Sequence, residues 1–266
     1  MRRKVALITG GITGIGKRTA IELARLDYEL ILTYRKSKDQ AYFLAEHIQN
    51  EYNVRVKCIH SDVSDLNSCS FLVENLMRDF QGVDVLIHNA GPYIHERKKM
   101  SEYSIEEWQY IMNGNLNSFF YLTRLLLPFM RMQKFGRIIT LGFDRSETAP
   151  AWLYRSAFAA AKSGLTSLTK TLALEEAENG ITVNMVCPGD IVPEWKEKDI
   201  GEAIGARDES VPVGRPGTGE DISRVISFLC SEQSSFITGS VISVTGGKDI
   251  LGKVHSSKIV NNRIND

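Results

Sequence analysis

The sequence has few of the residues that mark disulfide-rich or metal-binding proteins. It contains 4 cysteines and 5 histidines in 266 residues. Cys58, Cys69, Cys187 and Cys230 are widely spaced and form no C-x-x-C pair. This spacing argues against both a zinc site and a disulfide framework. We therefore expect reduced thiols and no bound metal.

The chain also lacks a net charge and a long apolar run. Its 32 basic and 32 acidic residues balance to a formal charge of +0, which leaves no electrostatic footprint for nucleic acid or an anionic membrane. No stretch reaches the roughly 20 apolar residues of a membrane-spanning helix, and the apolar run in the opening MRRKVALITGG is too short for a signal peptide. These absences predict a cytoplasmic protein that binds neither nucleic acid nor membrane.

Short apolar runs alternate with segments of helical pattern almost from end to end. The runs are rich in β-branched residues and have few polar interruptions, as expected of strands that are covered on both faces. They cover residues 4–9, 29–34, 54–60, 83–89, 136–141, 181–187 and 240–245. This alternation predicts an α/β fold, a Rossmann-type doubly wound parallel seven-stranded sheet with helices on both faces.

The same alternation predicts one domain over residues 1–249. Two segments depart from the pattern. Residues 190–219 are rich in proline, glycine and charge, and they are long enough to form a lid over a site. Residues 250–266 form a polar C-terminal tail.

A glycine-rich turn follows the first predicted strand directly. Residues 9–16 read TGGITGIG and open an amphipathic helix. Glycines at such a turn let the backbone approach a pyrophosphate and direct amide hydrogens at it from the positive end of the helix dipole. Strand, turn and helix in this order predict a dinucleotide site.

The end of the second predicted strand indicates which dinucleotide is bound. Enzymes that prefer NAD place an acidic residue there to hold the ribose 2′-hydroxyl. This chain has Tyr34, Arg35 and Lys36 instead, and an arginine can grip the 2′-phosphate of NADP in a fork. We therefore expect NADP(H) to be preferred over NAD(H), the alternative being that the two cations are a solvated loop.

Several motifs in order resemble those of the short-chain dehydrogenase/reductase family, from about Lys4 to Gly247. They are the glycine turn, Asp62-Val63, His88-Asn89-Ala90-Gly91, Asn115, Pro188-Gly189 and the stretch from Thr238-Gly239 to Gly246-Gly247. The resemblance implies a nicotinamide cofactor. It implies cofactor contacts at Thr9, Gly10, Gly14, Ile15, Gly16, Tyr34, Arg35, Lys36, Asp62, Val63, Asn89, Ala90, Gly91, Lys162, Pro188, Gly189 and Ile191.

The resemblance also implies a mechanism, and the sequence departs from it. In the family, hydride passes to a carbonyl carbon while a tyrosine supplies the proton, with a lysine, a serine and an asparagine in support. The lysine and asparagine correspond to Lys162 and Asn115, but Phe158 stands in the tyrosine position and Phe143 in the serine position. A phenyl ring has no proton to donate, and general acid catalysis contributes about 10²–10⁴ in rate.

Three interpretations follow. In the first, the proton donor has moved to Tyr154, which would share a face with Phe158 and Lys162 if their helix extends back that far. The spacing between Tyr154 and Lys162 is one residue longer than the spacing between the tyrosine and the lysine of the related enoyl-(acyl carrier protein) reductases. In the second, the chain is a silent cofactor-binding sensor or partner subunit. In the third, an activated substrate takes its proton from water or the ribose hydroxyl near Lys162.

The favoured function is therefore an NAD(P)H-dependent oxidoreductase with an atypical proton donor. Its substrate would be a small molecule, free or carrier-bound, with a carbonyl or an activated enoyl group such as an acyl thioester. The resemblance also implies a homodimer or homotetramer, which we expect to form through the helices of residues 104–134 and 156–178.

Overall fold

The computed structural model describes residues 2–80 and 82–248. They contain a seven-stranded sheet of order β3-β2-β1-β4-β5-β6-β7, in which every neighbouring pair is parallel. The strands are β1 (Val5–Ile8), β2 (Glu29–Tyr34), β3 (Val56–His60), β4 (Val85–His88), β5 (Gly136–Leu141), β6 (Ile181–Pro188) and β7 (Val241–Val244). Each predicted run contains one strand, so the predicted fold class is confirmed. The predicted tail lies outside the described residues.

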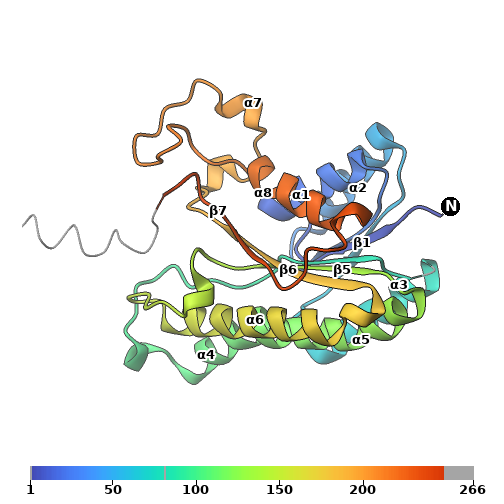
Figure 1. Ribbon diagram of the computed structural model, residues 1–266, viewed down its shortest axis with the longest axis horizontal. Coiled ribbons are helices and arrows are strands. Elements are labelled where there is room, and N and C mark those ends of the chain that lie inside the picture. Colours follow the sequence, from blue (N-terminus) through green and yellow to red (C-terminus); the bar gives the residue numbers. More distant parts are fainter. Residues whose placement is uncertain (1, 81, 249–266) are drawn as a thin grey trace, which may run out of the picture.

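Helices cover both faces of the sheet (Figure 1). On one face lie α1 (Gly14–Arg25), α2 (Lys38–Tyr52) and α8 (Gly219–Cys230), and on the other lie α3 (Leu66–Asp79), α5 (Ser118–Gln133) and α6 (Ser156–Glu175). Each set buries its apolar side chains against the sheet in a separate core. Because both faces are covered, the residues of β1 and β5 are all buried, and those of β1 are all apolar.

The strand order reverses between β1 and β4. From β1 the chain moves outward through β2 to β3, then returns to β4 on the other side of β1 and continues to β7. The loops that leave the carboxyl ends of β1 and β4 therefore diverge. In open α/β sheets this switch point forms the crevice in which ligands bind.

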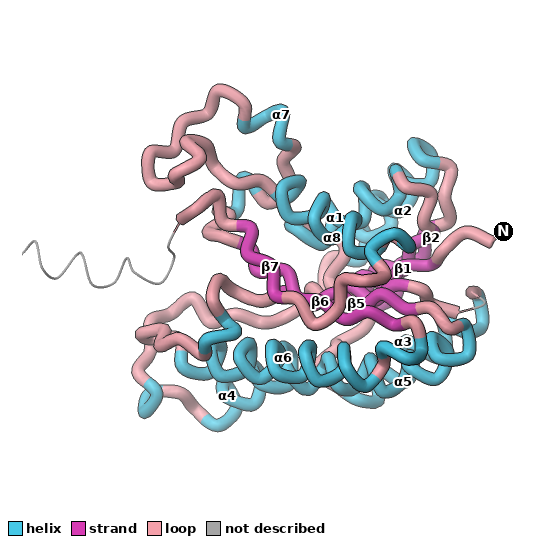
Figure 2. The backbone as a smooth tube through the Cα atoms, in the orientation of Figure 1, coloured by secondary structure: helices cyan, strands magenta, loops and turns pink. Residues whose placement is uncertain are grey.

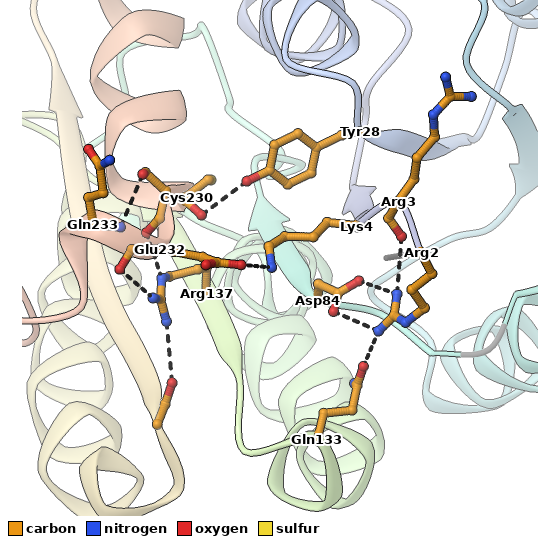
Figure 3. A network of polar contacts seen from close by, with 12 residues as sticks. Arg2, Arg3, Lys4, Tyr28, Asp84, Gln133, Arg137, Cys230, Glu232 and Gln233 are labelled. Carbon is orange, nitrogen blue, oxygen red and sulfur yellow. Dashed lines mark hydrogen bonds and ion pairs between the residues drawn. The ribbon is translucent and has the colours of Figure 1, made fainter.

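At the amino ends of the strands, polar contacts link neighbouring segments of the chain (Figure 3). Arg2 donates two hydrogen bonds to the Asp84 carboxylate, at 2.7 and 2.8 Å, and Asp84 also accepts the Val5 amide at 2.8 Å. Nearby, the buried Arg137 donates to the Ser231 carbonyl at 3.1 Å. Charge pairs with buried, hydrogen-bonded partners fix the amino ends of the strands, which leaves the carboxyl ends for the site.

The predicted lid is mostly loop (Figure 2). Residues 190–219 contain one short 3₁₀ turn, Pro193–Trp195, and the short helix α7 (Ile200–Ala203). In Figure 1 this segment rises beyond α8 and stands away from the layer of α5 and α6. In the described ranges, no helix is both long and apolar enough to cross a membrane.

Candidate active site

The glycine turn after β1 is packed too closely for side chains. A Cβ atom on Gly16 would lie 2.3 Å from the Gly10 carbonyl oxygen and 2.7 Å from Asn89 Nδ2. Gly10 and Gly14 have φ values of +61° and +57°, in the left-handed region that favours glycine. Helix α1 begins at Gly14, within this glycine-rich segment, so the segment carries the positive end of a helix dipole.

Thr9 and Asn89 tie the ends of β1 and β4 together. Thr9 Oγ1 accepts hydrogen bonds from the amides of Asn89 and Ala90, at 3.0 and 2.9 Å. Asn89 Nδ2 donates in return to the carbonyls of Thr9 and Gly10, at 2.9 and 3.2 Å. These bonds hold the two loops at a fixed separation across the switch point.

A cavity of about 350 Å³ opens beside this turn, along the carboxyl ends of β1, β2, β3 and β4. Seven of the residues predicted to contact the cofactor line it: Gly10, Tyr34, Arg35, Asp62, Val63, Ala90 and Gly91. Its other walls include Thr13, Thr33, Ser61, Ser64, Pro92, Tyr110 and Gly114. The cavity therefore brings together residues from four separate loops.

Arg35 lines this cavity, and its guanidinium contacts the side chains of Tyr110 and Asp62. It donates to the Tyr110 hydroxyl at 3.1 Å and lies 3.7 Å from the Asp62 carboxylate. Burial disfavours the charged form of Asp62, but hydrogen bonds from Ser64 and the charge of Arg35 outweigh it and hold the pKa of that carboxyl below its ordinary value. Arg35 keeps 44% of its side chain exposed, so it can turn toward an anion.

Tyr110 was missed by the sequence reasoning. It lies on α4 (Ile105–Met112), and Gly114 follows it one turn later, so both face the cavity. The signal that could have found Tyr110 is its spacing of five residues before Asn115, which places it just ahead of the predicted catalytic asparagine on the same continuous helical segment.

Some of the predicted cofactor residues do not line this cavity. Lys36 lines a neighbouring hollow with Tyr34 and Arg35, on the outer side of β2 and β3. Pro188 ends β6, and Gly189 follows it, while Ile191 lines a separate small cavity beneath the lid. Ile15 lies in the first turn of α1 and packs against the core. The contacts of these residues with a cofactor stay predictions.

Asn115 lies at the junction of two helices that precede β5, where the helical geometry changes. Between α4 and α5 the chain forms a π-helical turn, Asn113–Asn117, of a kind often found at functional sites. Asn115 Nδ2 donates to the carbonyls of Pro92 and Ile111, at 2.9 and 3.0 Å. Its Oδ1 is buried and has no hydrogen-bond partner among the described residues. A buried carbonyl oxygen left in this state is a place for a water or a ligand hydroxyl.

Lys162 reaches the same place from α6. A Cβ atom on Gly91 would lie 2.3 Å from Asn115 Oδ1 and 3.6 Å from Lys162 Nζ, so the two polar groups converge on this glycine. Lys162 Nζ donates to the Leu141 carbonyl at 2.7 Å and is buried. Burial lowers the pKa of Lys162 to about 8, which leaves its proton exchangeable near neutral pH.

Tyr154 does not continue the helix of Lys162, so the condition under which it would share a face with Phe158 and Lys162 is not met. Helix α6 begins at Ser156, and Tyr154 has φ +65°, in the left-handed region. Its ring lies 5.3 Å from the Arg97 guanidinium, in a cation–π arrangement. The loop before α6 turns sharply because the chain must come back from β5, and this turn removes Tyr154 from the face that carries Phe158 and Lys162.

Aromatic rings occupy the space in front of Lys162. Phe158 packs edge to face against Tyr93 and Trp152, with ring centroids 5.0 and 5.9 Å apart. The buried Phe143 lies 4.9 Å from Trp152 and 6.5 Å from Phe158. Such pairs stabilise one another beyond the area they bury. We call Tyr93, Phe143, Trp152 and Phe158 the aromatic cluster.

His88 lies at the end of β4 and packs against Phe119 of α5, with ring centroids 5.6 Å apart. It is fully buried, and its Nε2 lies 2.8 Å from Ser118 Oγ. Burial, with a smaller effect of the Lys162 charge, lowers the pKa of His88 to about 3. The imidazole is therefore neutral, and it acts as a polar core residue.

These features define a class of protein. A parallel sheet of this order with a glycine turn at the switch point is a Rossmann-type dinucleotide-binding fold, and here a buried lysine and asparagine lie beside the crevice. The glycines that leave no room for side chains, the orphan Asn115 Oδ1 and the exposed Arg35 at the cavity fit a nicotinamide dinucleotide. In the described ranges, no three His, Cys, Asp or Glu side chains gather as a metal site.

Comparison with known proteins gives the family. A family model described as enoyl-(acyl carrier protein) reductase matches residues 10–249. "Putative oxidoreductase YtkK" of Bacillus subtilis is 47% identical over 251 residues, covering 93% of this chain and 97% of that protein. The 3-oxoacyl-(acyl carrier protein) reductase FabG of Haemophilus influenzae is 35% identical over 247 residues, covering 93% and 98%. The chain therefore belongs to the short-chain dehydrogenase/reductase family of oxidoreductases.

A solved structure agrees with this assignment. A "putative 3-oxoacyl-reductase" from Bacillus thuringiensis superposes with a TM-score of 0.87 at 46% identity and covers 94% of this chain and 100% of that one. The acetoin dehydrogenase YohF of Salmonella typhimurium superposes with a TM-score of 0.83 at 31% identity, covering 92% and 96%. The relatives named here differ in the substrates that their names record.

Proposed function

We propose that this chain is an NADPH-dependent reductase of a carbonyl or an activated enoyl compound such as an acyl thioester. The observation that carries the proposal is the convergence of Lys162 Nζ and Asn115 Oδ1 on Gly91, which also lines the nucleotide cavity. The carboxyl ends of the strands would thus carry both a dinucleotide site and two polar groups that can take part in proton transfer. The thioester class is supported by relatives named as 3-oxoacyl-(acyl carrier protein) and acetoacetyl-CoA reductases.

Arg35 supports the preference for NADPH. A guanidinium can bind a phosphate with two hydrogen bonds, and charge-assisted bonds of this kind contribute about 1.5–3 kcal/mol. Arg35 lines the cavity beside Tyr34 and Ser61 and carries no acidic neighbour closer than the 3.7 Å contact with Asp62 among the described ion pairs. Lys36 points into the neighbouring hollow and would add long-range attraction only.

Other residues would orient the cofactor and take part in proton transfer. When bound, the nicotinamide would supply a hydride to the substrate. Lys162 would hold the ribose hydroxyls with its ammonium group, which is protonated below its pKa of about 8. Asn115 Oδ1 would accept a hydrogen bond from a water that connects Lys162 to solvent. Pro188, Gly189 and Ile191 would follow the nicotinamide end of the cofactor beneath the lid.

Phe158 and Phe143 bear on whether the site can protonate a substrate. We infer that they fill the positions of the family's tyrosine and serine, because Phe158 lies one turn before Lys162 on α6 and Phe143 follows β5. Neither ring can donate a proton or hold a carbonyl oxygen. This observation favours the second candidate function, an NADPH-binding sensor or partner subunit without turnover.

A titration and a substrate panel separate the two candidates. Purified protein is first titrated with NADPH and with NADH by cofactor fluorescence. It is then offered a β-ketoacyl thioester, an enoyl thioester, ketones, aldehydes and quinones with NADPH. We expect tighter binding of NADPH than of NADH and NADPH oxidation with a thioester. Tight binding with no turnover on the whole panel would contradict the reductase and support the sensor.

The helices that were predicted to form an oligomer also present an apolar surface. A groove of about 380 Å³ between α5 and α6 is lined in part by Phe119, Phe120, Leu127, Leu168 and Leu172. Phe120 is 52% exposed and Leu168 38%, and contiguous apolar surface of this kind marks an interface. We propose that a second copy covers it, which light scattering of Leu168→Glu against the wild type would test as a change in mass.

A further inference from the structure

The ring of Tyr93 packs against the ring of Phe158, which lies one turn before Lys162 on α6. We propose that Tyr93 donates the proton in this reductase and that Arg155 positions it. This inference rests on the proposed function, because a sensor needs no proton donor. It differs from the interpretation based on Tyr154, which lies outside helix α6.

The position of Tyr93 in the chain connects it to the cofactor cavity. It comes directly after Gly91 and Pro92, and both of these residues line the cavity. The loop after β4 therefore carries Tyr93 from the nucleotide cavity into the aromatic cluster. At the carboxyl end of a central strand, a side chain is placed to reach the reacting end of a ligand in the crevice.

The ring of Tyr93 contacts Phe158 directly. Their centroids are 5.0 Å apart and their planes are nearly perpendicular, at 86°. A helical side chain leans toward the amino end of its helix, so the Phe158 ring leans over the first turn of α6, where Arg155 is the N-cap residue. Arg155 Nε donates to the Tyr93 hydroxyl at 2.5 Å. The Tyr93 hydroxyl is thus hydrogen-bonded to the N-cap residue of the helix that carries Phe158 and Lys162.

Arg155 is held rigidly enough to position this phenol. Its other nitrogens donate to the carbonyls of Glu96 at 2.7 Å, Tyr154 at 3.0 Å and His95 at 2.9 Å. Since the guanidinium donates to the phenol oxygen, the hydrogen of that phenol is free to point at a substrate. The same guanidinium would stabilise the phenolate that remains after proton transfer, because a charge-assisted hydrogen bond strengthens as the acceptor gains charge.

Other hydroxyls near the aromatic cluster are less suitable. Ser146 is buried beneath Phe143, accepts a hydrogen bond from Thr166 at 2.9 Å and contacts the sulfur of Met185. Tyr103 packs against the apolar group that also contains Phe158, and burial raises its pKa, which makes it a weaker acid. In the described part of the chain, Tyr93 is the tyrosine whose ring contacts Phe158.

The proposed step is a simple proton transfer coupled to reduction. As the carbonyl carbon accepts a hydride from NADPH, the electron pair of its C=O π bond moves to the oxygen. The O–H bond of Tyr93 breaks and an O–H bond forms on that oxygen, which gives the alcohol and NADP⁺. Water then returns a proton to the phenolate; Tyr93 is only partly buried, so solvent can reach it.

The test compares three tyrosine variants that each remove one hydroxyl. Tyr93→Phe, Tyr103→Phe and Tyr154→Phe are assayed with NADPH and the best thioester, and their NADPH Kd and melting temperature are measured. We expect Tyr93→Phe to lower kcat by about 100-fold or more, the scale of general acid catalysis, with an unchanged Kd and melting temperature. The two control variants should stay within about threefold of the wild type, as expected where no hydrogen bond to substrate is lost.

A rescue variant separates the proton from the packing. Tyr93→Phe/Phe158→Tyr restores a hydroxyl one helical turn from Lys162 and should regain at least about tenfold in kcat over Tyr93→Phe. Turnover that survives Tyr93→Phe would overturn this inference alone. A loss of turnover accompanied by an equal loss of NADPH affinity would also overturn it, because Tyr93 would then be structural. Absence of turnover in the wild type, with NADPH bound, would overturn both this inference and the proposed reductase.

Discussion

The two ends of the crevice are built by different means. At the nucleotide end, backbone groups and short polar side chains fix the loops, as in the bonds of Thr9 and Asn89 to one another's main chain. At the other end, large rings fill the space and touch through their faces and edges. A backbone cradle tolerates few residue types, whereas an aromatic cluster can be rebuilt from other rings.

This difference indicates which half of the site tolerates fewer substitutions. Gly16 has no room for even a methyl group, so any chain that keeps the turn must keep the glycine. Phe158 and Trp152 are partly exposed, and their rings contact one another and neighbouring side chains without fixed hydrogen bonds to the glycine turn. Chemistry can therefore change at the aromatic end while the nucleotide end stays the same.

The sharpest test of this contrast is Gly16→Ala. Its added methyl would lie 2.3 Å from a backbone carbonyl oxygen, so the turn must shift away from the phosphate position. We expect the Kd for NADPH to rise about 100-fold, which corresponds to about 2.7 kcal/mol. Cofactor fluorescence measures the affinity, and thermal unfolding shows whether the fold remains.

A glycine without neighbours gives the control. Gly201 lies in α7, and an added Cβ would meet nothing within 4 Å. Gly201→Ala should leave the Kd for NADPH unchanged and should not destabilise the chain, because alanine favours helix. Equal affinities of Gly16→Ala and the wild type would show that the turn is not the phosphate site.

The buried His88 should make the protein sensitive to acid. Its folded pKa of about 3 lies below the ordinary value of 6.5, so the unfolded chain binds a proton between these values and the folded chain does not. Stability is therefore complete above pH 6.5 and falls as the pH drops toward 3. At pH 5 the loss is about 2 kcal/mol.

His88→Asn removes this titration. Urea unfolding at pH 7 and pH 5 should show a fall in stability that is smaller in the variant by about 2 kcal/mol. All other titrating groups are shared by the two proteins and cancel in the difference. Parallel falls in the two proteins would mean that His88 is protonated in the folded state.

Arg35 tests the outer rim of the nucleotide end. Arg35→Gln keeps a hydrogen-bonding side chain and removes the charge. We expect the ratio of NADH to NADPH Kd to fall about tenfold, or about 1.4 kcal/mol, from the loss of one charge-assisted contact. Lys36→Gln is the matched control and should change the ratio by less than about threefold, because Lys36 does not line the cavity. An unchanged ratio in Arg35→Gln would remove this residue from the specificity argument.

The contrast between the two ends of the crevice also explains which features could be predicted from the sequence. All seven strands were found, because strands covered by helices on both faces are rich in apolar residues. The glycine turn was found because its backbone geometry demands particular residues in a fixed order. The helix predicted over residues 156–178 does begin at Ser156, but the left-handed turn at Tyr154 was not foreseen, since it carries no glycine or proline to mark it. The contact between Tyr93 and Arg155 joins residues 62 positions apart, and nothing local marks such a pair.

The smallest expected effect concerns the lid, whose Glu197 contacts the glycine turn. Glu197 accepts the Gly14 amide at 2.9 Å and pairs with Lys17 at 2.7 Å. Burial opposes its charge, but Lys17 and the Gly14 amide outweigh burial and hold the pKa of Glu197 below its ordinary value. A carboxylate thus lies at the helix end where phosphate binds in such folds.

Glu197→Gln should therefore strengthen NADPH binding slightly. The glutamine can still accept the Gly14 amide, but it no longer repels an incoming phosphate. Because the Glu197 side chain is 38% exposed, its charge is screened by solvent, and we expect a gain of at most about fivefold in affinity, below 1 kcal/mol. Glu194→Gln, at an exposed lid position three residues earlier, should change nothing. A weaker affinity in Glu197→Gln would mean that the lid carboxylate supports the bound state through Lys17, so that the lid and the glycine turn act together rather than in competition.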